Sequence, residues 1–189
     1  MESIYLIGII VLAAIVIVII YNLIVTRMNA VVRAWADVVT QERQKNNVLP
    51  TLEKIASDYK DYEATILKQV TELRTSLKNL NTDTMNLGAL SETSEKTISL
   101  LNGLYAVAEN YPVLKASELY RDLMAEITEQ QENISAAIRI FNRNVEEFNN
   151  SIEMFPNSLI NSLFNKKSKL NTFSDTQAES DFEYKPNIT

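Results

Sequence analysis

The sequence predicts an all-α protein in which an N-terminal transmembrane helix continues into an antiparallel bundle of long helices, similar to a four-helix bundle. Two observations support this fold class. Residues 4–20 are apolar and uncharged, and later apolar residues recur three or four positions apart, which is the spacing of one helix face. No alternating polar and apolar stretch is long enough to indicate a β-strand. Amphipathic helices joined by short connections usually bury their apolar faces in an antiparallel bundle.

The first apolar stretch has the length of a membrane span. As a helix rising about 1.5 Å per residue, residues 4–25 extend roughly 33 Å, and the hydrocarbon core of a bilayer is about 30 Å thick. A cleavable signal peptide has basic residues before its apolar region and small residues at its cleavage site, whereas Glu2 precedes this stretch and Tyr21 lies at its end. We therefore expect an uncleaved anchor at residues 4–25.

The charges beside the anchor predict its orientation. Basic residues follow the apolar stretch within about 20 residues, and no basic side chain precedes it. These residues are Arg27, Arg33, Arg43 and Lys45. The positive-inside rule then places a short N-terminus outside and residues 26–189 in the cytoplasm. We expect a single-pass protein of the cell (inner) membrane.

Residues 26–156 are predicted to form the bundle. The first helix continues from the anchor to about Asn46, with Val31, Trp35 and Val38 on its apolar face. It ends before Pro50, because the residue before a proline disfavours helix. The second helix has the most regular apolar stripe, formed by Leu52, Ile55, Tyr59, Tyr62, Ile66, Val70, Leu73, Leu77 and Leu80. A polar connection follows at residues 81–88.

Two further helices complete the predicted bundle. The third ends near Tyr111-Pro112, and Ser117 is the predicted N-cap of the fourth, which ends before Pro156. The apolar face of the third helix consists of Ile98, Leu101, Tyr105 and Ala108. The stripe of the fourth consists of Leu119, Leu123, Ile127, Ile134, Ala137, Phe141, Val145, Phe148, Ile152 and Phe155, with Gln130 in its one polar place.

Two segments follow the bundle. Residues 157–170 form a short amphipathic basic segment, in which Lys166, Lys167 and Lys169 follow apolar residues. Either this segment closes the bundle, which we favour because it is short for a surface helix, or it lies on anionic lipid through those lysines. Residues 171–189 form an acidic, polar tail that we expect either to be disordered, which we favour, or to dock late along the bundle.

The composition argues against several classes of function. The chain has 18 basic and 24 acidic residues, a net charge of −6, whereas nucleic-acid binding needs a basic face. It has no histidine and no cysteine, which excludes most zinc, haem and iron–sulfur sites and every triad with a histidine base. Glu126, Glu129 and Glu132 recur on the fourth helix, but di-iron bundles also need histidine, so a solvated face is expected. The sequence predicts no enzyme, no cofactor, no metal site and no nucleic-acid partner.

Several short motifs occur in order along the chain. They are Tyr21-Asn22-Leu23-Ile24-Val25, Ala34-Trp35, Leu49-Pro50-Thr51-Leu52, Glu109-Asn110-Tyr111-Pro112, Phe141-Asn142, Phe148-Asn149 and Phe155-Pro156. Together they resemble the LemA family over roughly residues 21–164. The family often has histidines on both sides of the proline break, where this chain has Gln44-Lys45-Asn46-Asn47 and Asp61-Tyr62-Glu63, so no role of those histidines applies here.

The resemblance implies a mostly bacterial protein with an N-terminal membrane helix and a soluble helical bundle. Some members of the family are associated with the formation of bacterial membrane organelles. The resemblance therefore points towards organisation at membranes rather than catalysis.

Two pairs of asparagines are spaced seven residues apart: Asn22 with Asn29, and Asn142 with Asn149. A polar residue that recurs at one heptad position can fix the register between helices. In an antiparallel bundle both pairs fall at the membrane-proximal end, where they are candidates to contact one another or a partner helix. The alternative is that asparagine is simply tolerated on a half-exposed helix face.

These observations favour a non-enzymatic scaffold or adaptor that presents its bundle to a protein partner at the lipid bilayer. The partner is an unidentified protein or, through self-association, a second copy of the chain. The alternative function is membrane remodelling or lipid-surface binding through residues 157–170.

Overall fold

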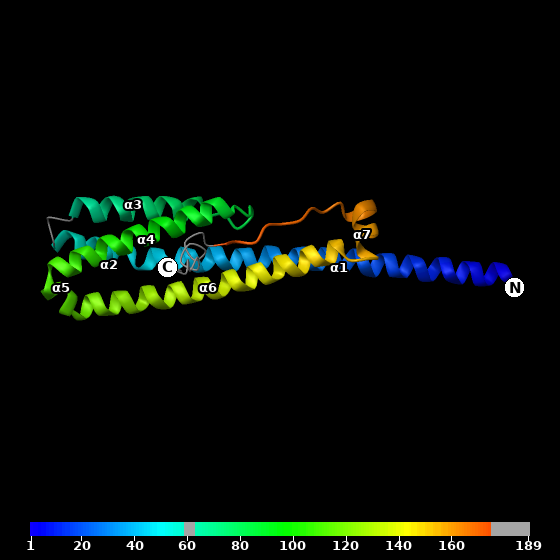
Figure 1. Cartoon of the computed structure of the whole chain (residues 1–189), viewed down its shortest axis with the longest axis horizontal. Coiled ribbons are helices and arrows are strands. Elements are labelled where there is room, and N and C mark those ends of the chain that lie inside the picture. The colour runs from blue at the N-terminus through cyan, green and yellow to red at the C-terminus, as the bar shows by residue number, and fades with distance from the viewer. Residues whose placement is uncertain (59–62, 175–189) are drawn as a thin grey trace, which may run out of the picture. The chain divides into compact units, whose positions relative to one another are not determined.

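The computed structural model describes residues 1–58 and 63–174, and all regular structure in these residues is helical (Figure 1). The predicted all-α fold class is therefore confirmed. The long helices are α1 (Glu2–Gln44), α3 (Glu63–Asn79), α4 (Leu87–Asn110) and α6 (Glu118–Glu153). The shorter ones are α2 (Leu49–Asp58), α5 (Pro112–Ala116) and α7 (Asn157–Ile160), with a 3₁₀ turn at Lys45–Asn47 and a π turn at Asn161–Asn165.

Helix α1 confirms that the apolar N-terminal stretch continues into the folded helices without a break. It ends at the 3₁₀ turn, and Pro50 stands in the first turn of α2, where its missing N–H leaves no helical hydrogen bond unmade. The predicted core residues Val31, Trp35 and Val38 are fully buried. Only their periodicity on one helix face had indicated this burial.

Contacts between Cα atoms divide the described residues into two compact units. The first unit comprises residues 1–34 and 139–172. The second unit comprises residues 35–138 together with Phe173 and Ser174. Both boundaries fall inside the long helices α1 and α6 rather than in a loop.

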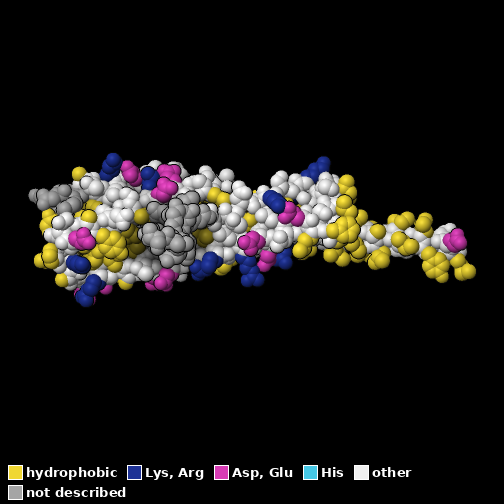
Figure 2. All heavy atoms as spheres, viewed as in Figure 1, with side chains coloured by type: hydrophobic (Ala, Val, Ile, Leu, Met, Phe, Trp, Pro, Cys, Tyr) yellow, Lys and Arg dark blue, Asp and Glu magenta, His cyan; other side chains and the backbone are white. Residues whose placement is uncertain are grey.

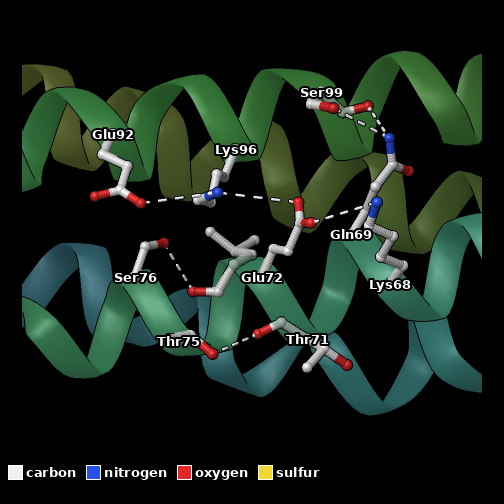
Figure 3. Close-up of polar contacts among 10 residues, drawn as sticks. Lys68, Gln69, Thr71, Glu72, Thr75, Ser76, Glu92, Lys96 and Ser99 are labelled. Carbon is white, nitrogen blue, oxygen red and sulfur yellow. Dashed lines mark hydrogen bonds and ion pairs between the residues drawn. The ribbon is translucent and has the colours of Figure 1, made fainter.

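In the second unit, α3 and α4 run antiparallel with polar contacts along their shared surface (Figure 3). Lys96 Nζ lies 3.9 Å from Glu72 Oε2 and 3.7 Å from Glu92 Oε1. Further along, Gln69 Nε2 donates to the carbonyl and hydroxyl oxygens of Ser99, at 3.1 and 3.0 Å. Residue numbers rise along α3 as they fall along α4, which is the antiparallel order that the sequence predicts.

The predicted second helix, with its stripe from Leu52 to Leu80, is wrong as a single helix, because α2 ends at Asp58, α3 begins at Glu63 and the two pack against each other. All described members of that stripe are buried, and Tyr59 and Tyr62 lie outside the described residues. The end of α3 is fixed by side chains of α1, because Trp35 Nε1 donates to Asn81 O (2.8 Å) and Arg43 to Leu80 O (2.7 Å). These bonds satisfy carbonyl groups that a helix end leaves without a helical partner.

Capping residues fix where two of the helices begin. The Asn86 side chain accepts from Ala89 N–H at 3.0 Å and caps α4. The Ser117 hydroxyl accepts from Tyr120 N–H at 3.2 Å, which confirms the predicted N-cap of α6. Tyr111 separates α4 from α5, as the predicted turn requires.

Two predicted core faces are partly wrong. On α4 the buried face consists of Leu90, Thr93, Thr97, Leu100, Leu104, Val107 and Ala108. Tyr105 is exposed, and Ile98 and Leu101 are only half-buried, because this face is rotated by about one residue from the predicted stripe. On α6 both ends of the predicted stripe are exposed, with Leu119 at 40% and Phe155, just beyond the helix, at 80%.

In the first unit, α1 and α6 also run antiparallel. Arg27 forms an ion pair with Glu147, and Asn165 donates to Tyr21 O at 3.5 Å. Asn165 belongs to the π turn after α7, and Figure 1 shows the first-unit parts of α1 and α6 running in opposite directions. The packed face of α6 includes the fully buried residues Phe141, Val145 and Phe148, and Ile24 of α1 is also fully buried.

Candidate functional site

The amino-terminal part of α1 exposes apolar side chains. Ile4 is 74% and Ile19 is 60% exposed, and Figure 2 shows hydrophobic side chains along this end of the helix. Among the described residues, this is the one helix that is long and apolar enough to cross a membrane, and an 18-residue stretch of it has a mean hydropathy of 3.2. A core helix with this composition would be mostly buried, whereas 6% of this stretch is buried. A large exposed apolar surface indicates a partner or a lipid environment.

A second apolar surface lies near the end of this stretch. Phe155, Leu159, Leu163 and Phe164, in and next to α7, are all exposed. The hydrogen bond from Asn165 to Tyr21 O joins this segment to α1 immediately after residues 4–20. Within the first unit, the apolar residues of α7 and its π turn therefore adjoin the end of the exposed apolar part of α1 (Figure 1).

Two asparagines hold the chain that follows α7 through paired hydrogen bonds. Asn149 Nδ2 donates to Leu170 O at 2.9 Å, and Leu170 N–H donates to Asn149 Oδ1 at 3.0 Å. Asn161 bonds in the same two-point manner to the N–H and carbonyl of Lys167, at 3.0 and 2.9 Å. Each side-chain amide donates through its nitrogen and accepts through its oxygen, so it satisfies both the carbonyl and the N–H of one backbone residue. We call these contacts the asparagine clamps.

The asparagine clamps fix the predicted basic cluster in place. Lys166, Lys167 and Lys169 are all exposed. Lys166 adopts the left-handed conformation (φ 49°), which is uncommon outside glycine and ends the π turn. The ammonium group of Lys169 pairs with Glu153 at 2.5 Å, whereas the other two lysines of this cluster, Lys166 and Lys167, form no ion pair with a described residue.

The remaining asparagines predicted to set register lie elsewhere in the first unit. Asn22 and Asn29 are exposed on α1, and Asn142 is half-buried on α6. Asn149 bonds to the backbone of Leu170 through both ends of its amide. A register role of the two asparagine pairs stays a prediction.

A buried ion pair is the main polar feature in the core of the second unit. Lys45 Nζ lies 2.7 Å from Glu42 Oε2, and the two side chains are 5% and 2% exposed. The same ammonium group donates to Thr97 Oγ1 at 3.0 Å, and Thr97 donates to the Thr93 carbonyl at 2.8 Å. Gln130, the polar residue in the stripe of α6, is also buried and donates to Glu126 at 3.2 Å.

A cavity of about 20 Å³ adjoins this ion pair and is lined by Lys45, Thr97 and Gln130 among other residues. Gln130 Oε1 is buried and has no hydrogen-bond partner in the described part of the chain. A space of this size holds about one water molecule, which needs two or more polar partners. The walls of this cavity are almost entirely apolar, so the space does not meet that requirement.

An open groove of about 690 Å³ lies between α4, α5 and α6, and we call it the tyrosine groove. Tyr120 is buried and Met124 is half-buried, whereas Tyr105 is exposed. Glu109, Glu129 and Glu132 add three exposed carboxylates to the lining. Ala108 and Ala125 also line the groove, and their small side chains leave space between the helices.

The environment of Tyr120 favours its neutral form. Burial raises the pKa of the Tyr120 hydroxyl, and the nearby Tyr105 and Glu109 raise it further. An anionic phenolate is disfavoured there because it would lose hydration and face negative charge. At neutral pH the Tyr120 hydroxyl is therefore uncharged.

The three regularly spaced glutamates of α6 have different surroundings. Glu129 and Glu132 line the tyrosine groove, while Glu126 accepts the hydrogen bond from Gln130. Within residues 1–58 and 63–174, no group of three or more acidic side chains is placed to hold a metal ion.

Sequence reasoning missed the Glu42–Lys45 pair and the tyrosine groove. The one available signal for the pair was opposite charge three residues apart beside the buried Val38 and Val39. For the groove, the available signal was the small residues Ala108 and Ala125 among tyrosines and glutamates. Neither signal separates a buried or grooved surface from an ordinary solvated helix face.

Two comparisons relate the chain to known proteins. The LemA family model matches residues 34–188. The chain is also 30% identical, over 127 residues, to the protein named Protein LemA of Metamycoplasma hominis. This match covers 67% of the chain and 57% of that relative, so it spans little more than half of the relative's length.

Proposed function

Because the chain belongs to the LemA family and its first helix is apolar enough to span a membrane, we propose that it is a non-enzymatic, single-pass membrane protein that presents its helices as a scaffold or adaptor for a protein partner. The motif resemblance to this family is thereby confirmed. The observation that carries the proposal is α1 itself, which exposes apolar side chains in its first part and buries Val31, Trp35 and Val38 further on.

The proposed location is the inner membrane of a bacterial cell, with the N-terminus outside and the helical units in the cytoplasm. The basic residues after the apolar stretch support this orientation through the positive-inside rule. The proposal names no reaction, because the sequence has no histidine or cysteine and the described residues hold no cluster of metal-binding side chains.

Cysteine labelling tests the anchor and its orientation together. The chain has no cysteine, and Ser174 is exposed, so Ser174→Cys introduces a unique reactive thiol. In intact cells or spheroplasts, a membrane-impermeant maleimide should label this variant only after permeabilisation. The matched control Ser3→Cys, before the apolar stretch, should be labelled without permeabilisation.

The labelling outcomes separate two failures of the proposal. The opposite labelling of the two variants would reverse the orientation and keep the anchor. Release of the protein from membranes by alkaline carbonate would refute the anchor itself, since a spanning helix resists such extraction.

A second candidate function is contact with the lipid surface through α7. The observation that favours it is the exposed apolar set of Leu159, Leu163 and Phe164 beside the end of the apolar part of α1. Apolar side chains next to basic ones are typical of segments that bind at the lipid interface.

Brominated lipids test this second candidate directly. With Trp35→Phe as background, Phe164→Trp creates a single tryptophan that bromine atoms near the headgroups should quench. Tyr105→Trp in the same background is the matched control and should not be quenched. Equal fluorescence of Phe164→Trp in brominated and ordinary lipid would refute lipid contact and leave the anchor untouched.

A further inference from the structure

We infer that the tyrosine groove binds a short, basic, extended peptide segment of a partner protein. This inference rests on the proposed scaffold function and names the chemistry of the partner. It uses side chains of the second unit alone, from α4, α5 and α6.

Charge complementarity selects a cationic occupant. The groove lining carries the carboxylates of Glu109, Glu129 and Glu132 against one ammonium group, that of Lys115. No ion pair joins these three carboxylates to a basic side chain within the described residues. Their charge is therefore available to a ligand, and complementary charge speeds association and excludes partners of the wrong sign.

The two tyrosines favour arginine-containing segments. Tyr105 is exposed and Tyr120 is buried, and both tyrosines line the groove together with the three glutamates. A guanidinium group stacks on aromatic rings and donates to carboxylates in the same plane, which a lysine ammonium does not do. Met124 adds a flexible apolar contact for a neighbouring aliphatic residue.

The dimensions fit a short peptide. Along α6 the lining extends from Tyr120 to Glu132, which corresponds to roughly 18 Å at 1.5 Å per residue. An extended chain covers this length with about five or six residues. The volume of about 690 Å³ also lies within the range of small-ligand and peptide pockets.

Charge argues against the chain's own C-terminal tail as the occupant. Residues 175–189 contain Asp175, Glu179, Asp181 and Glu183 and one basic residue, Lys185. This sign is the same as that of the groove, so the two repel. A basic segment from a different protein complements the groove instead.

Fluorescence anisotropy with the full chain in phosphatidylcholine nanodiscs tests the inference. The probe is a fluorescein-labelled hexapeptide of alternating arginine and leucine, and the matched probe has glutamate in place of arginine. Zwitterionic lipid keeps the basic probe off the bilayer. The arginine probe should bind with saturation and weaken with added salt, whereas the glutamate probe should not bind.

Paired variants locate the binding in the groove. Glu129→Gln with Glu132→Gln should weaken binding about tenfold, since each exposed ion pair contributes roughly threefold. Glu95→Gln with Glu146→Gln removes the same charge from exposed positions outside the groove and should change binding less than twofold. Tyr105→Ala should weaken binding about threefold, and Tyr105→Phe should restore it, because phenylalanine keeps the ring face.

Several results would overturn the inference. They are absence of arginine-probe binding, equal binding of the glutamate probe, and equal effects of the two glutamine double variants. A wild-type oligomer that dissociates in the Glu129→Gln, Glu132→Gln variant would assign the groove to a second copy of the chain and also overturn it. The fraction of each variant recovered with membranes is measured in parallel. Loss of peptide binding by a protein that stays in the membrane refutes the groove inference alone, whereas loss of the protein from the membrane refutes the proposed membrane-anchored scaffold.

Discussion

Replacing Lys45 by methionine should strongly destabilise the second unit. The Lys45 and Glu42 side chains are 5% and 2% exposed, and their charged atoms lie 2.7 Å apart. With an effective dielectric constant of about 20, unit charges at this distance attract by about 6 kcal/mol. Burying each ion costs several kcal/mol, so the intact pair contributes little net stability. Lys45→Met removes the attraction and leaves the Glu42 carboxylate buried without its partner.

We therefore expect Lys45→Met to lower the free energy of unfolding by about 4 kcal/mol. The double variant Glu42→Leu, Lys45→Met should lie within about 1 kcal/mol of wild type or above it, because it removes both buried charges. Arg74→Met breaks a partly exposed ion pair with Glu53 in the same unit and is the matched control, with a cost of less than about 1 kcal/mol.

Urea unfolding of the full chain in detergent micelles measures these differences. Trp35 is the single tryptophan and is fully buried in the second unit, so its fluorescence reports on the affected core. With an m-value of about 2 kcal/mol per molar, a loss of 4 kcal/mol lowers the midpoint by about 2 M. A Lys45→Met variant no less stable than Arg74→Met would refute the argument, because it would mean that the pair is hydrated.

Three further predictions concern single groups. Thr97→Val removes the hydroxyl that accepts from the Lys45 ammonium and should cost about 2 kcal/mol in the same urea assay, whereas Thr71→Val on the exposed surface should cost less than about 0.5 kcal/mol. Asn149→Ala loses two hydrogen bonds to Leu170, each worth about 1 kcal/mol, so the segment that contains Lys166, Lys167 and Lys169 should detach more often. Trypsin should then cleave after these lysines roughly 30-fold faster. The adjacent, exposed Asn150→Ala is the control and should not change the cleavage rate. Because the pKa of Tyr120 is raised in the folded state, its contribution to the free energy of unfolding is present below pH 10 and is lost as the pH rises above 10. Between pH 9 and 11, wild type should therefore lose more stability than Tyr120→Phe. Equal losses in the two proteins would contradict the environment assigned to Tyr120.

Several helix boundaries could be predicted because single residues determine them, whereas the end of α2 at Asp58 and the start of α3 at Glu63 were missed because the apolar stripe runs across both helices. Pro50 and Pro112 stand in the first turns of α2 and α5, where proline costs no hydrogen bond, and Ser117 caps α6 through its hydroxyl. These effects are local, so they depend little on tertiary packing. The continuity of α1 follows in the same way from the lack of proline and glycine between Asn22 and Asn46.

The buried face of α4 could not be predicted from apolar periodicity because two of its members are threonines. Thr93 and Thr97 each donate to the carbonyl four residues earlier, at 2.8 Å. These bonds satisfy the hydroxyl donors within the helix, so the methyl groups can pack in the core. If threonine is counted as polar, apolar periodicity predicts that the adjacent face of the helix is buried, and that face carries Ile98, Leu101 and Tyr105.

The asparagine clamps escaped prediction for a different reason. Heptad spacing relates Asn142 to Asn149 along one helix, but the partner of Asn149 is the backbone of Leu170, 21 residues later. A backbone partner leaves no side-chain pattern in the sequence. Only the path of the chain after α7 brings the two groups together.

Two errors in the predicted core concern residues in or next to the tyrosine groove. Tyr105 was expected inside and is 49% exposed, while Leu119 was expected inside and Tyr120, next to it, is buried instead. Leu119 and Tyr120 precede the buried Leu123 by four and three residues, so helical periodicity permits either one. Apolar periodicity predicts the buried residues reliably only where other helices cover the whole of one helix face. On a helix face that is only half covered, one ring can be buried, as Tyr120 is, while another stays exposed to solvent, as Tyr105 does. The proposed peptide groove contains both a buried and an exposed ring. The pattern therefore failed where Tyr105 of α4 and Tyr120 of α6 line an open groove, because neither helix face is fully covered there.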